Sequence, residues 1–440
     1  MKINRRTFLK TTGTSAAGLL IVPRLFADDA PSKVLHIAQI GCGRMGSDDM
    51  VGMMKHPRVR MVAVCDLDTK RAGIAKTTVE NFYKNKGETA VDVKEYHDHR
   101  AVLAQPGIDG VLVCVPDHWH AQVGIEAAAA GKHIFGQKPL TYDIAGSIAL
   151  TEAVRAKKVI FQTGSQQRSE NPWPTFRLAS EAVRNGRIGK LKTIKIGLGI
   201  DKPSGHAPAA MPVPQTLDWD RLLGAAPQQD YMEGRVHSQS SITGRPGWIT
   251  TEDFGLGMIT NWGAHHIDIA HWAMGQELGG PKTIEAQAEF MHNDVWTVHT
   301  SYHVEMVYPD DVLVILDNKY EVGILFEGSE GSVFCTRGGA KVNASDPNLP
   351  VDASDALRPS DPKILAPFGA DAKRWAPSPN HYFNWIDSIL ANTDPIAPVD
   401  QAARSLQACA AAWIAMKLKR KLTWDAARQV FVKDDKANAM

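Results

Sequence analysis

The sequence predicts an α/β protein: an N-terminal doubly wound parallel sheet followed by a C-terminal α/β domain with a large, mostly antiparallel open sheet. Three observations support this fold class. Short apolar runs alternate with helical stretches up to about residue 163. Longer runs in which apolar and polar residues alternate follow from residue 164. The length of 440 residues suits two or three domains.

Composition and charge exclude several classes of protein. Apolar residues make up 44% and charged residues 22%, which is typical of a globular chain and excludes a wholly disordered, fibrous or polytopic membrane protein. The 49 basic and 48 acidic residues give a net charge of +1, without the basic excess of a nucleic-acid-binding protein. The five cysteines are scattered and form no C-x-x-C pair, so we expect free buried thiols.

Residues 1–30 have the pattern of an export signal. Basic residues are followed by an apolar run at 11–22, which is much shorter than the ~20 residues of a membrane-spanning helix. The adjacent Arg5 and Arg6 resemble a twin-arginine signal, with an ordinary secretory signal or a lipid-free N-terminal anchor as the alternatives. We therefore expect a bacterial protein that the twin-arginine machinery exports folded, with its cofactor loaded. Its expected location is the periplasm or another extracytoplasmic compartment, without stable membrane insertion after cleavage.

The first domain is expected over residues 33–163. Its apolar runs are short and bounded by glycine, proline or polar residues, as in strands buried on both faces of a parallel sheet. Helical stretches separate them, which is the alternation of a doubly wound sheet. The predicted strands lie at 34–41, 59–66, 110–116 and 132–139.

The second domain is expected over residues 164–440. Alternating apolar and polar residues predict a half-exposed, largely antiparallel sheet, with strands at 191–200, 283–290, 301–308, 311–317, 320–328 and 331–339. The Pro/Gly-rich stretches 201–250 and 340–380 are expected to be excursions over a site or an interface. Helical periodicity returns at 381–391 and 400–418.

A glycine-rich motif follows the first strand. Residues 41–46 read GCGRMG, a G-x-G-x-x-G pattern that begins a predicted helix. The first glycine permits a tight turn, the second lets the backbone approach a pyrophosphate, and the third packs helix on strand. Free N–H groups at the helix N-terminus favour the phosphates. The motif therefore predicts a dinucleotide site formed by Gly41, Gly43, Arg44, Met45 and Gly46.

An aspartate indicates which dinucleotide binds. Asp66 ends the second predicted strand, twenty residues after Gly46, where a carboxylate binds the ribose 2′-hydroxyl of NAD. The nearby Lys70 and Arg71 would tolerate a 2′-phosphate, so NADP remains possible. We expect NAD as the cofactor.

Two further strand ends converge on the same rim. Lys138 lies in the tripeptide Gln137-Lys138-Pro139 at a strand end, where ligands bind in open α/β sheets. A lysine there is suited to hold or move the proton of a substrate hydroxyl. Pro116 and His120 follow the preceding predicted strand, and we expect them to line the cofactor site together with Lys138.

A polar helix is predicted over residues 261–272. Asn261 and His265 lie one turn apart, and His265 and Asp268 share a face. A metal site is disfavoured because His265 and His266 point about 100° apart on a helix and no metal motif is completed. We interpret the segment as a substrate-facing helix, with a purely structural helix as the alternative.

Together, the motifs GCGRMG, Asp66 after VRMVAV, VPDHWH, GQKP and NWGAHHIDIAHW resemble the glucose–fructose oxidoreductase/inositol dehydrogenase family (Gfo/Idh/MocA) in order and spacing. FEGSEGS at 326–332 and DPIAPVDQAARS at 394–405 also match, so the resemblance runs from Lys33 to about residue 425. It implies an NAD(P)-binding Rossmann domain and an α/β domain whose open sheet carries a substrate site and an oligomer interface. It also implies an enzyme that oxidises or reduces secondary hydroxyls of sugars, cyclitols or their derivatives.

The resemblance assigns roles to single residues. Lys138 matches the lysine of the family's E-K-P tripeptide, in which Gln137 replaces the glutamate. His265 matches the catalytic histidine, and Asn261 stands where an aspartate is usual. The implied catalytic residues are thus Lys138, His265 and Asn261. The implied substrate-binding residues are Asp268 and Arg168, and no metal is implied.

Export restricts the mechanism, because the periplasm has no replenished pool of free NAD. A tightly bound cofactor that is recycled in place satisfies this restriction. We therefore expect a sugar oxidoreductase, and Lys138 favours it because the related NAD-dependent glycosidases lack this lysine. The alternatives are a redox-neutral glycosidase or lyase that acts through a transient ketosugar, and a non-catalytic protein that binds NAD or a sugar.

Overall fold

The computed structural model describes residues 33–440, apart from residues 89–91, 202–208, 242–243, 292–294 and 339–354. The expected export signal at 1–30 lies outside the described residues. Val34–Met440 forms a unit of its own, and the description below concerns this unit. No helix in the described ranges is both long and apolar enough to span a membrane.

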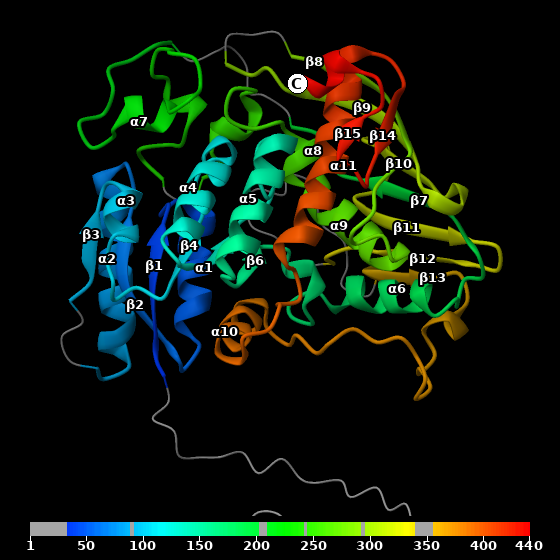
Figure 1. Cartoon of the computed structure of the whole chain (residues 1–440), viewed down its shortest axis with the longest axis horizontal. Helices are drawn as coiled ribbons and strands as arrows, with labels where there is room; N and C mark the ends of the chain where they lie inside the picture. Colours follow the sequence, from blue (N-terminus) through cyan, green and yellow to red (C-terminus); the bar gives the residue numbers. More distant parts are fainter. Residues whose placement is uncertain (1–32, 89–91, 202–208, 242–243, 292–294, 339–354) are drawn as a thin grey trace, which may run out of the picture. The chain divides into compact units, whose positions relative to one another are not determined.

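The N-terminal half forms a six-stranded parallel sheet in the order β3-β2-β1-β4-β5-β6 (Figure 1). This is the strand order of a doubly wound dinucleotide-binding fold. Each predicted run contains a strand, and two strands of three residues complete the sheet. The strands are β1 (Leu35–Ile40), β2 (Val59–Cys65), β3 (Lys94–Tyr96), β4 (Gly110–Val113), β5 (His133–Gly136) and β6 (Phe161–Thr163).

Helices cover both faces of this sheet. Apolar residues of α3, α4, α5 and the start of α11 pack on one face, and those of α1, α2 and α10 pack on the other. Two of these helices, α10 and α11, come from the far end of the chain, so the predicted second domain also covers the first sheet (Figure 1). The helices are α1 (Arg44–Met54), α2 (Thr69–Asn85), α3 (His99–Leu103), α4 (Asp117–Ala129), α5 (Ile144–Lys157), α10 (His381–Ala391) and α11 (Val399–Leu418).

The second sheet has nine strands among the described residues, in the order β13-β12-β11-β7-β10-β9-β8-β14-β15. Only β7 and β10 pair in parallel; the other pairs are antiparallel, as predicted. Its strands are β7 (Leu191–Gly197), β8 (Thr283–Phe290), β9 (His299–Val307), β10 (Leu313–Asp317), β11 (Gly323–Gly328), β12 (Ser332–Cys335), β13 (Leu357–Pro359), β14 (Leu422–Asp425) and β15 (Val430–Phe431).

One face of the second sheet carries the largest core of the molecule. Alternate residues of its strands pack against three helices, α6 (Pro174–Arg184), α9 (Gly263–Met274) and α11. The remaining helices are short: α7 (Trp219–Leu223), α8 (Met258–Asn261) and α12 (Asp435–Asn438). The 3₁₀ turns are η1 (Gln166–Arg168), η2 (Glu233–Arg235), η3 (Gly247–Thr250), η4 (Pro309–Asp311) and η6 (Pro362–Leu365).

Two sequence predictions need correction. The single helix expected over 261–272 is divided at Trp262, which ends α8 and begins α9. The 340–380 stretch was expected to be an excursion, but its described part contributes β13 to the edge of the second sheet. Periodicity did not reveal β13, β14 or β15 because strands of two to four residues are too short to show it.

Candidate active site

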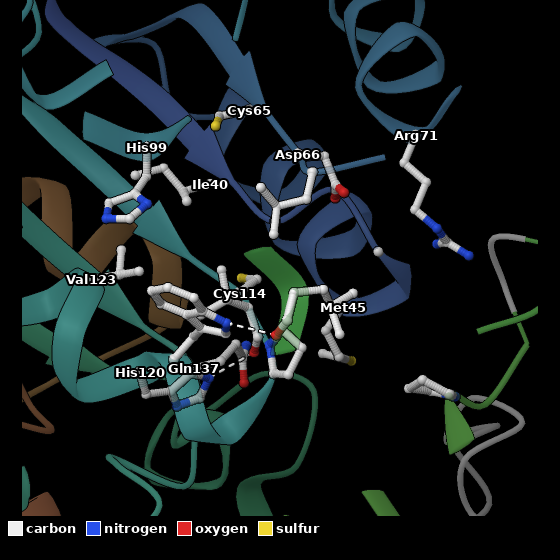
Figure 2. A pocket seen from close by; sticks show the side chains of 18 of the residues that line it. Ile40, Met45, Cys65, Asp66, Arg71, His99, Cys114, His120, Val123 and Gln137 are labelled. Carbon is white, nitrogen blue, oxygen red and sulfur yellow. Dashed lines mark hydrogen bonds between the residues drawn. The ribbon is translucent and has the colours of Figure 1, made fainter. Parts of the chain in front are cut away.

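A pocket lies at the carboxyl ends of the strands of the first sheet (Figure 2). It encloses about 1260 Å³, part of which is open to solvent. Asp66 and Arg71 lie at one end, and His120 and Gln137 at the other. The second half of the chain contributes Arg221, Leu222, His237, Gly244, Pro246 and Trp248 to its lining.

The glycine-rich loop has the shape that a pyrophosphate requires. A Cβ on Gly41 would lie 2.3 Å from the carbonyl oxygen of Cys114, and Gly41 has a φ of +86°. A Cβ on Gly46 would lie 2.0 Å from the Gly41 carbonyl oxygen, so this glycine packs helix on strand. By contrast, a Cβ on Gly43 would meet nothing nearer than 3.9 Å. The backbone at Gly43 therefore leaves room for a ligand to approach.

The first turn of α1 can receive an anion. Gly43 is its N-cap residue and supplies no side-chain cap, which leaves the N–H groups of the first turn for a ligand. Gly41, Gly43, Arg44 and Met45 line the pocket, whereas Gly46 lies behind it. The donor set and the open backbone thus fit the phosphates of a dinucleotide.

Asp66 is held at the pocket by two backbone amides. Its Oδ2 accepts from the N–H of Cys42 at 2.7 Å, and its Oδ1 accepts from the N–H of Asp68 at 2.8 Å. Burial raises the pKa of Asp66, and these two hydrogen bonds oppose the rise. The carboxylate lies where the sequence predicts a contact with the ribose, and that contact remains a prediction.

A segment of the second half of the chain folds over this end of the pocket; we call residues 216–239 the clasp. The N–H of Thr69 donates to the carbonyl of Thr216 at 2.8 Å, and Gln239 Nε2 donates to Asp68 Oδ2 at 2.9 Å. Arg71 donates to the carbonyl of Ser238 at 3.1 Å. The clasp therefore bridges directly to the start of α2.

The clasp has an apolar core of its own and a second attachment to the first domain. Leu217, Trp219 and Leu223 are buried together with Phe254. Trp119 Nε1, on α4, donates to the carbonyl of Leu222 at 2.9 Å. This segment is part of the excursion predicted from 201–250, and the structure places it over the pocket.

Lys138 lies at the opposite end of the pocket, two residues after the end of β5. Burial lowers the pKa of its ammonium group, the carboxylate of Asp117 opposes that change, and Arg337 and Arg245 reinforce it. His120 supports the neighbouring loops, since its Nδ1 lies 2.7 Å from the carbonyl of Pro139 and its Nε2 lies 2.9 Å from that of Val115. Pro116 lines the same pocket as the N-cap residue of α4.

Asp117 is a site residue that the sequence analysis missed. It is 4% exposed and lines the pocket together with Lys138. Burial raises its pKa, and the nearby ammonium of Lys138 opposes the rise. The signal was present in VPDHWH, but an aspartate in the first turn of a helix is also the ordinary complement of the helix dipole.

His265 and Asn261 come from α9 and α8 and are both buried. His265 is 6% exposed, and its Nδ1 has no hydrogen-bond partner among the described residues. Burial lowers the pKa of His265 well below its ordinary value, and the charges of Arg337 and Lys138 lower it further. The structure thus brings Lys138 and a neutral His265 within electrostatic range, although neither His265 nor Asn261 lines the pocket itself.

Arg168 and Asp268 require a correction. The sequence analysis assigned both to substrate binding, but they form a buried bidentate ion pair, with Nε–Oδ2 at 2.6 Å and Nη2–Oδ1 at 2.7 Å. Arg168 also donates to the carbonyl of Ile396 at 3.0 Å, and Ser405 Oγ donates to Asp268 at 3.1 Å. The structure assigns the pair to joining η1, α9 and α11, in place of the predicted substrate contact.

The fold and the site define an oxidoreductase that binds NAD through a Rossmann domain. Residues 35–165 match the family model described as "Oxidoreductase family, NAD-binding Rossmann fold". Residues 204–350 match the model described as "Oxidoreductase family, C-terminal alpha/beta domain". The chain belongs to the Gfo/Idh/MocA oxidoreductase family, as its motifs indicated.

Relatives of known sequence agree with this assignment. The oxidoreductase YrbE of Bacillus subtilis is 23% identical over 321 residues, 72% of this chain and 76% of that protein. Myo-inositol 2-dehydrogenase of Thermotoga maritima is 29% identical over 192 residues, 43% of this chain and 49% of that protein. A glycosyl hydrolase family 109 protein of Shewanella pealeana is 30% identical over 164 residues, 33% of this chain and 35% of that protein.

Solved structures share the fold along most of the chain. The WlbA dehydrogenase from Bordetella pertussis, in complex with NADH and UDP-GlcNAcA, is 16% identical with a TM-score of 0.61. The aldose–aldose oxidoreductase from Caulobacter crescentus, complexed with glycerol, is 16% identical with a TM-score of 0.59. Each comparison covers 89% of this chain and 99% of the other.

Proposed function

We propose that this protein is an exported, NAD-dependent oxidoreductase that acts on a secondary hydroxyl of a sugar, a cyclitol or a derivative and keeps its cofactor bound between turnovers. The observation that carries the proposal is the clasp, which bridges to Asp68 and Arg71 over one end of the pocket. A cofactor held beneath it has to wait for these hydrogen bonds to open before it leaves. Retention of this kind suits a compartment without free NAD.

The residues of the first domain would hold the dinucleotide. The N–H groups at the start of α1 would bind its phosphates, and Asp66 would bind the ribose. Lys138 and Asp117 lie at the other end, where the strand-end loops meet. A nicotinamide cofactor bound there would supply hydride-transfer chemistry to the substrate carbon.

Lys138 is the proposed acceptor of the hydroxyl proton. Burial lowers its pKa, so a larger fraction of the amine is deprotonated near neutral pH than for an exposed lysine. The carboxyl group of Asp117 lies in the same pocket, and its ionised form stabilises the ammonium once the proton has arrived. His265, which is neutral and buried, offers a second acceptor or a hydrogen bond to the substrate.

The names of relatives support the substrate class. One relative is a myo-inositol 2-dehydrogenase, and one structural neighbour is an aldose–aldose oxidoreductase. A secondary hydroxyl on a ring is common to their substrates. For this chain we propose that one sugar is oxidised and a second is reduced at the same bound cofactor, so that no free NADH is released.

The test is to express the full chain with its N-terminal segment, recover it from the periplasm and purify it without added cofactor. We expect about one NAD(H) per chain after denaturation, and a ketosugar when a panel of sugars and cyclitols is supplied with a second sugar as acceptor. Recovery only from the cytoplasm would contradict export. Turnover that requires free NAD would contradict cofactor retention.

A redox-neutral glycosidase or lyase is the second candidate, and the match to a glycosyl hydrolase family 109 protein favours it. In that case Lys138 would accept the hydroxyl proton as a transient ketosugar forms, and the product would be a released aglycone. Aglycone release without accumulation of ketosugar would establish this candidate. We rank it second because Lys138 is present.

We also propose that the protein is a homo-oligomer. The face of the second sheet opposite the helices presents the half-buried apolar residues Leu313, Ile315 and Leu325, whereas their neighbours Val314 and Leu316 enter the core. A second copy would cover this face. Light scattering of the purified protein should give at least twice the chain mass, and Ile315→Lys should reduce it.

A further inference from the structure

A buried carboxylate lies behind the active-site lysine, and the proposed mechanism gives it no role. Asp49 of α1 is 0% exposed. Its Oδ2 accepts from Gln137 Nε2 at 2.7 Å and from Cys114 Sγ at 3.1 Å, and its Oδ1 accepts from the hydroxyl of Tyr382 at 2.9 Å. The cluster thus joins α1, the ends of β4 and β5, and α10.

Gln137 connects this carboxylate to Lys138. While its amide nitrogen donates to Asp49, its Oε1 accepts from the backbone N–H of Lys138 at 3.3 Å. The amide also packs against Gly164, where a Cβ would lie 2.7 Å from its atoms. The side chain is therefore held from both sides, and its orientation follows from its two partners.

The cluster also explains why a glutamine occupies the position of the family's glutamate. A glutamate at 137 would place two carboxylates in contact in a buried space, and an ionised glutamate has no proton to donate to Asp49. Burial raises the pKa of Asp49 to about 6, while hydrogen bonds from Gln137, Cys114 and Tyr382 oppose the rise. Asp49 is thus largely ionised at neutral pH.

We propose that Asp49 is a positioning residue for Lys138: it carries the negative charge that the glutamate of the E-K-P tripeptide would supply, and Gln137 transmits its position to the lysine backbone. The inference rests on the proposed function, because it assumes that Lys138 accepts the substrate proton. It adds that part of the negative charge supporting this lysine comes from α1, besides the charge of Asp117 on α4.

The sign of the effect follows from the charges that face Lys138. They are the carboxylates of Asp117 and Asp49, which raise its pKa, and the guanidinium groups of Arg337 and Arg245, which lower it. The neutral His265 and His120 also lie within electrostatic range of Lys138. Removing the charge of Asp49 therefore lowers the pKa of Lys138 further.

The experiment compares Asp49→Asn, Gln137→Glu and the double variant Asp49→Asn/Gln137→Glu in the full-length protein as purified. The first readout is the pH dependence of amine labelling at Lys138, followed by peptide mass spectrometry. The second is the pH profile of kcat. Asp49→Asn should move both profiles about one pH unit lower, the scale of one charge several Å away.

Gln137→Glu alone should reduce kcat at least tenfold, because it sets two carboxylates against each other. The double variant exchanges donor and acceptor and keeps one charge, so its labelling profile and kcat should return to within about threefold of the parent. Tyr382→Phe is the matched control. It removes one hydrogen bond from Asp49 and raises the pKa of that carboxyl group, but the carboxylate stays ionised at the higher pH at which Lys138 titrates, so the labelling profile of Lys138 should stay in place.

An unchanged labelling profile in Asp49→Asn would overturn the inference. So would a double variant whose labelling profile and kcat are no closer to those of the parent than the values of Gln137→Glu. If Asp49→Asn does not fold, the comparison of the double variant with Gln137→Glu still decides it. The labelling readout requires no turnover. A parent protein that forms no ketosugar but shows the labelling shift would contradict the proposed function and leave the positioning role in place.

Discussion

Arg168 and Asp268 face each other in a buried, bidentate ion pair, with donor–acceptor distances of 2.6 and 2.7 Å. Arg168 ends η1, just after the last strand of the first sheet, and Asp268 lies one turn beyond His265 on α9. The pair therefore joins the segment that follows the first sheet to the helix that carries the candidate catalytic histidine.

Arg168→Met should lower the free energy of unfolding by about 3–5 kcal/mol, because it leaves the carboxylate of Asp268 buried without its partner. The double variant Arg168→Met/Asp268→Leu should be less destabilised than either single variant, since it leaves no buried charge. Urea denaturation monitored by tryptophan fluorescence measures both. If Arg168→Met instead has normal stability and a raised KM, the predicted contact between Arg168 and the substrate would be supported.

Lys138→Met and His265→Ala should each slow the chemical step at least a hundredfold while NAD stays bound, because each removes a candidate proton acceptor. If the two act as one relay, the double variant should be little worse than either single variant. Single-turnover kinetics on cofactor-loaded protein provide the measurement. Near-normal turnover in Lys138→Met would remove the lysine from the mechanism and leave His265 as the base.

Asp117→Asn should move the rise of kcat with pH to lower pH. The carboxylate raises the pKa of Lys138, and a base becomes active as pH passes its pKa, so loss of the negative charge lets Lys138 act at lower pH. The pH profile of kcat checks this. Asp253→Asn is the control, because Asp253 does not line the pocket. A profile that moves to higher pH would contradict the pairing of Asp117 with Lys138.

Gln239→Ala should accelerate loss of the bound cofactor, since it removes the hydrogen bond between the clasp and Asp68. A lost hydrogen bond to a charged group is worth about 1.5–3 kcal/mol, which corresponds to at least a tenfold faster release. Fluorescence of bound NADH during dilution reports the rate. Gln228→Ala is the matched control, because Gln228 bonds to Asp220 within the clasp. Equal rates in the two variants would show that the clasp does not retain the cofactor.

Asp66→Ser should raise the affinity for NADP relative to NAD by about tenfold or more, because it removes a negative charge that repels a 2′-phosphate beside Arg71. Titration of the apoprotein with each cofactor measures the ratio. The assignment of Asp66 to the ribose would be wrong if NADP bound no better and NAD binding were unaffected.

The sequence by itself determined the features that depend on local periodicity and motif. The structure confirms several of them. They are the glycine-rich loop, the strands in the four apolar runs of the first sheet, and the helices at 381–391 and 400–418. Such features are set by residues within a turn or two of each other, so one sequence contains all the information. The family also followed from motifs in order along the chain.

The tertiary structure alone decided which residues that are distant in the sequence meet. Asp49 and Tyr382 are 333 positions apart, and Arg168 and Asp268 are 100 apart, yet each pair is in hydrogen-bond contact. The clasp likewise reaches α2 across more than 140 positions of the chain. No periodicity records such contacts, because they depend on how two sheets and their helices pack. For this reason Arg168 looked like a substrate ligand in the sequence and is part of a buried ion pair in the fold.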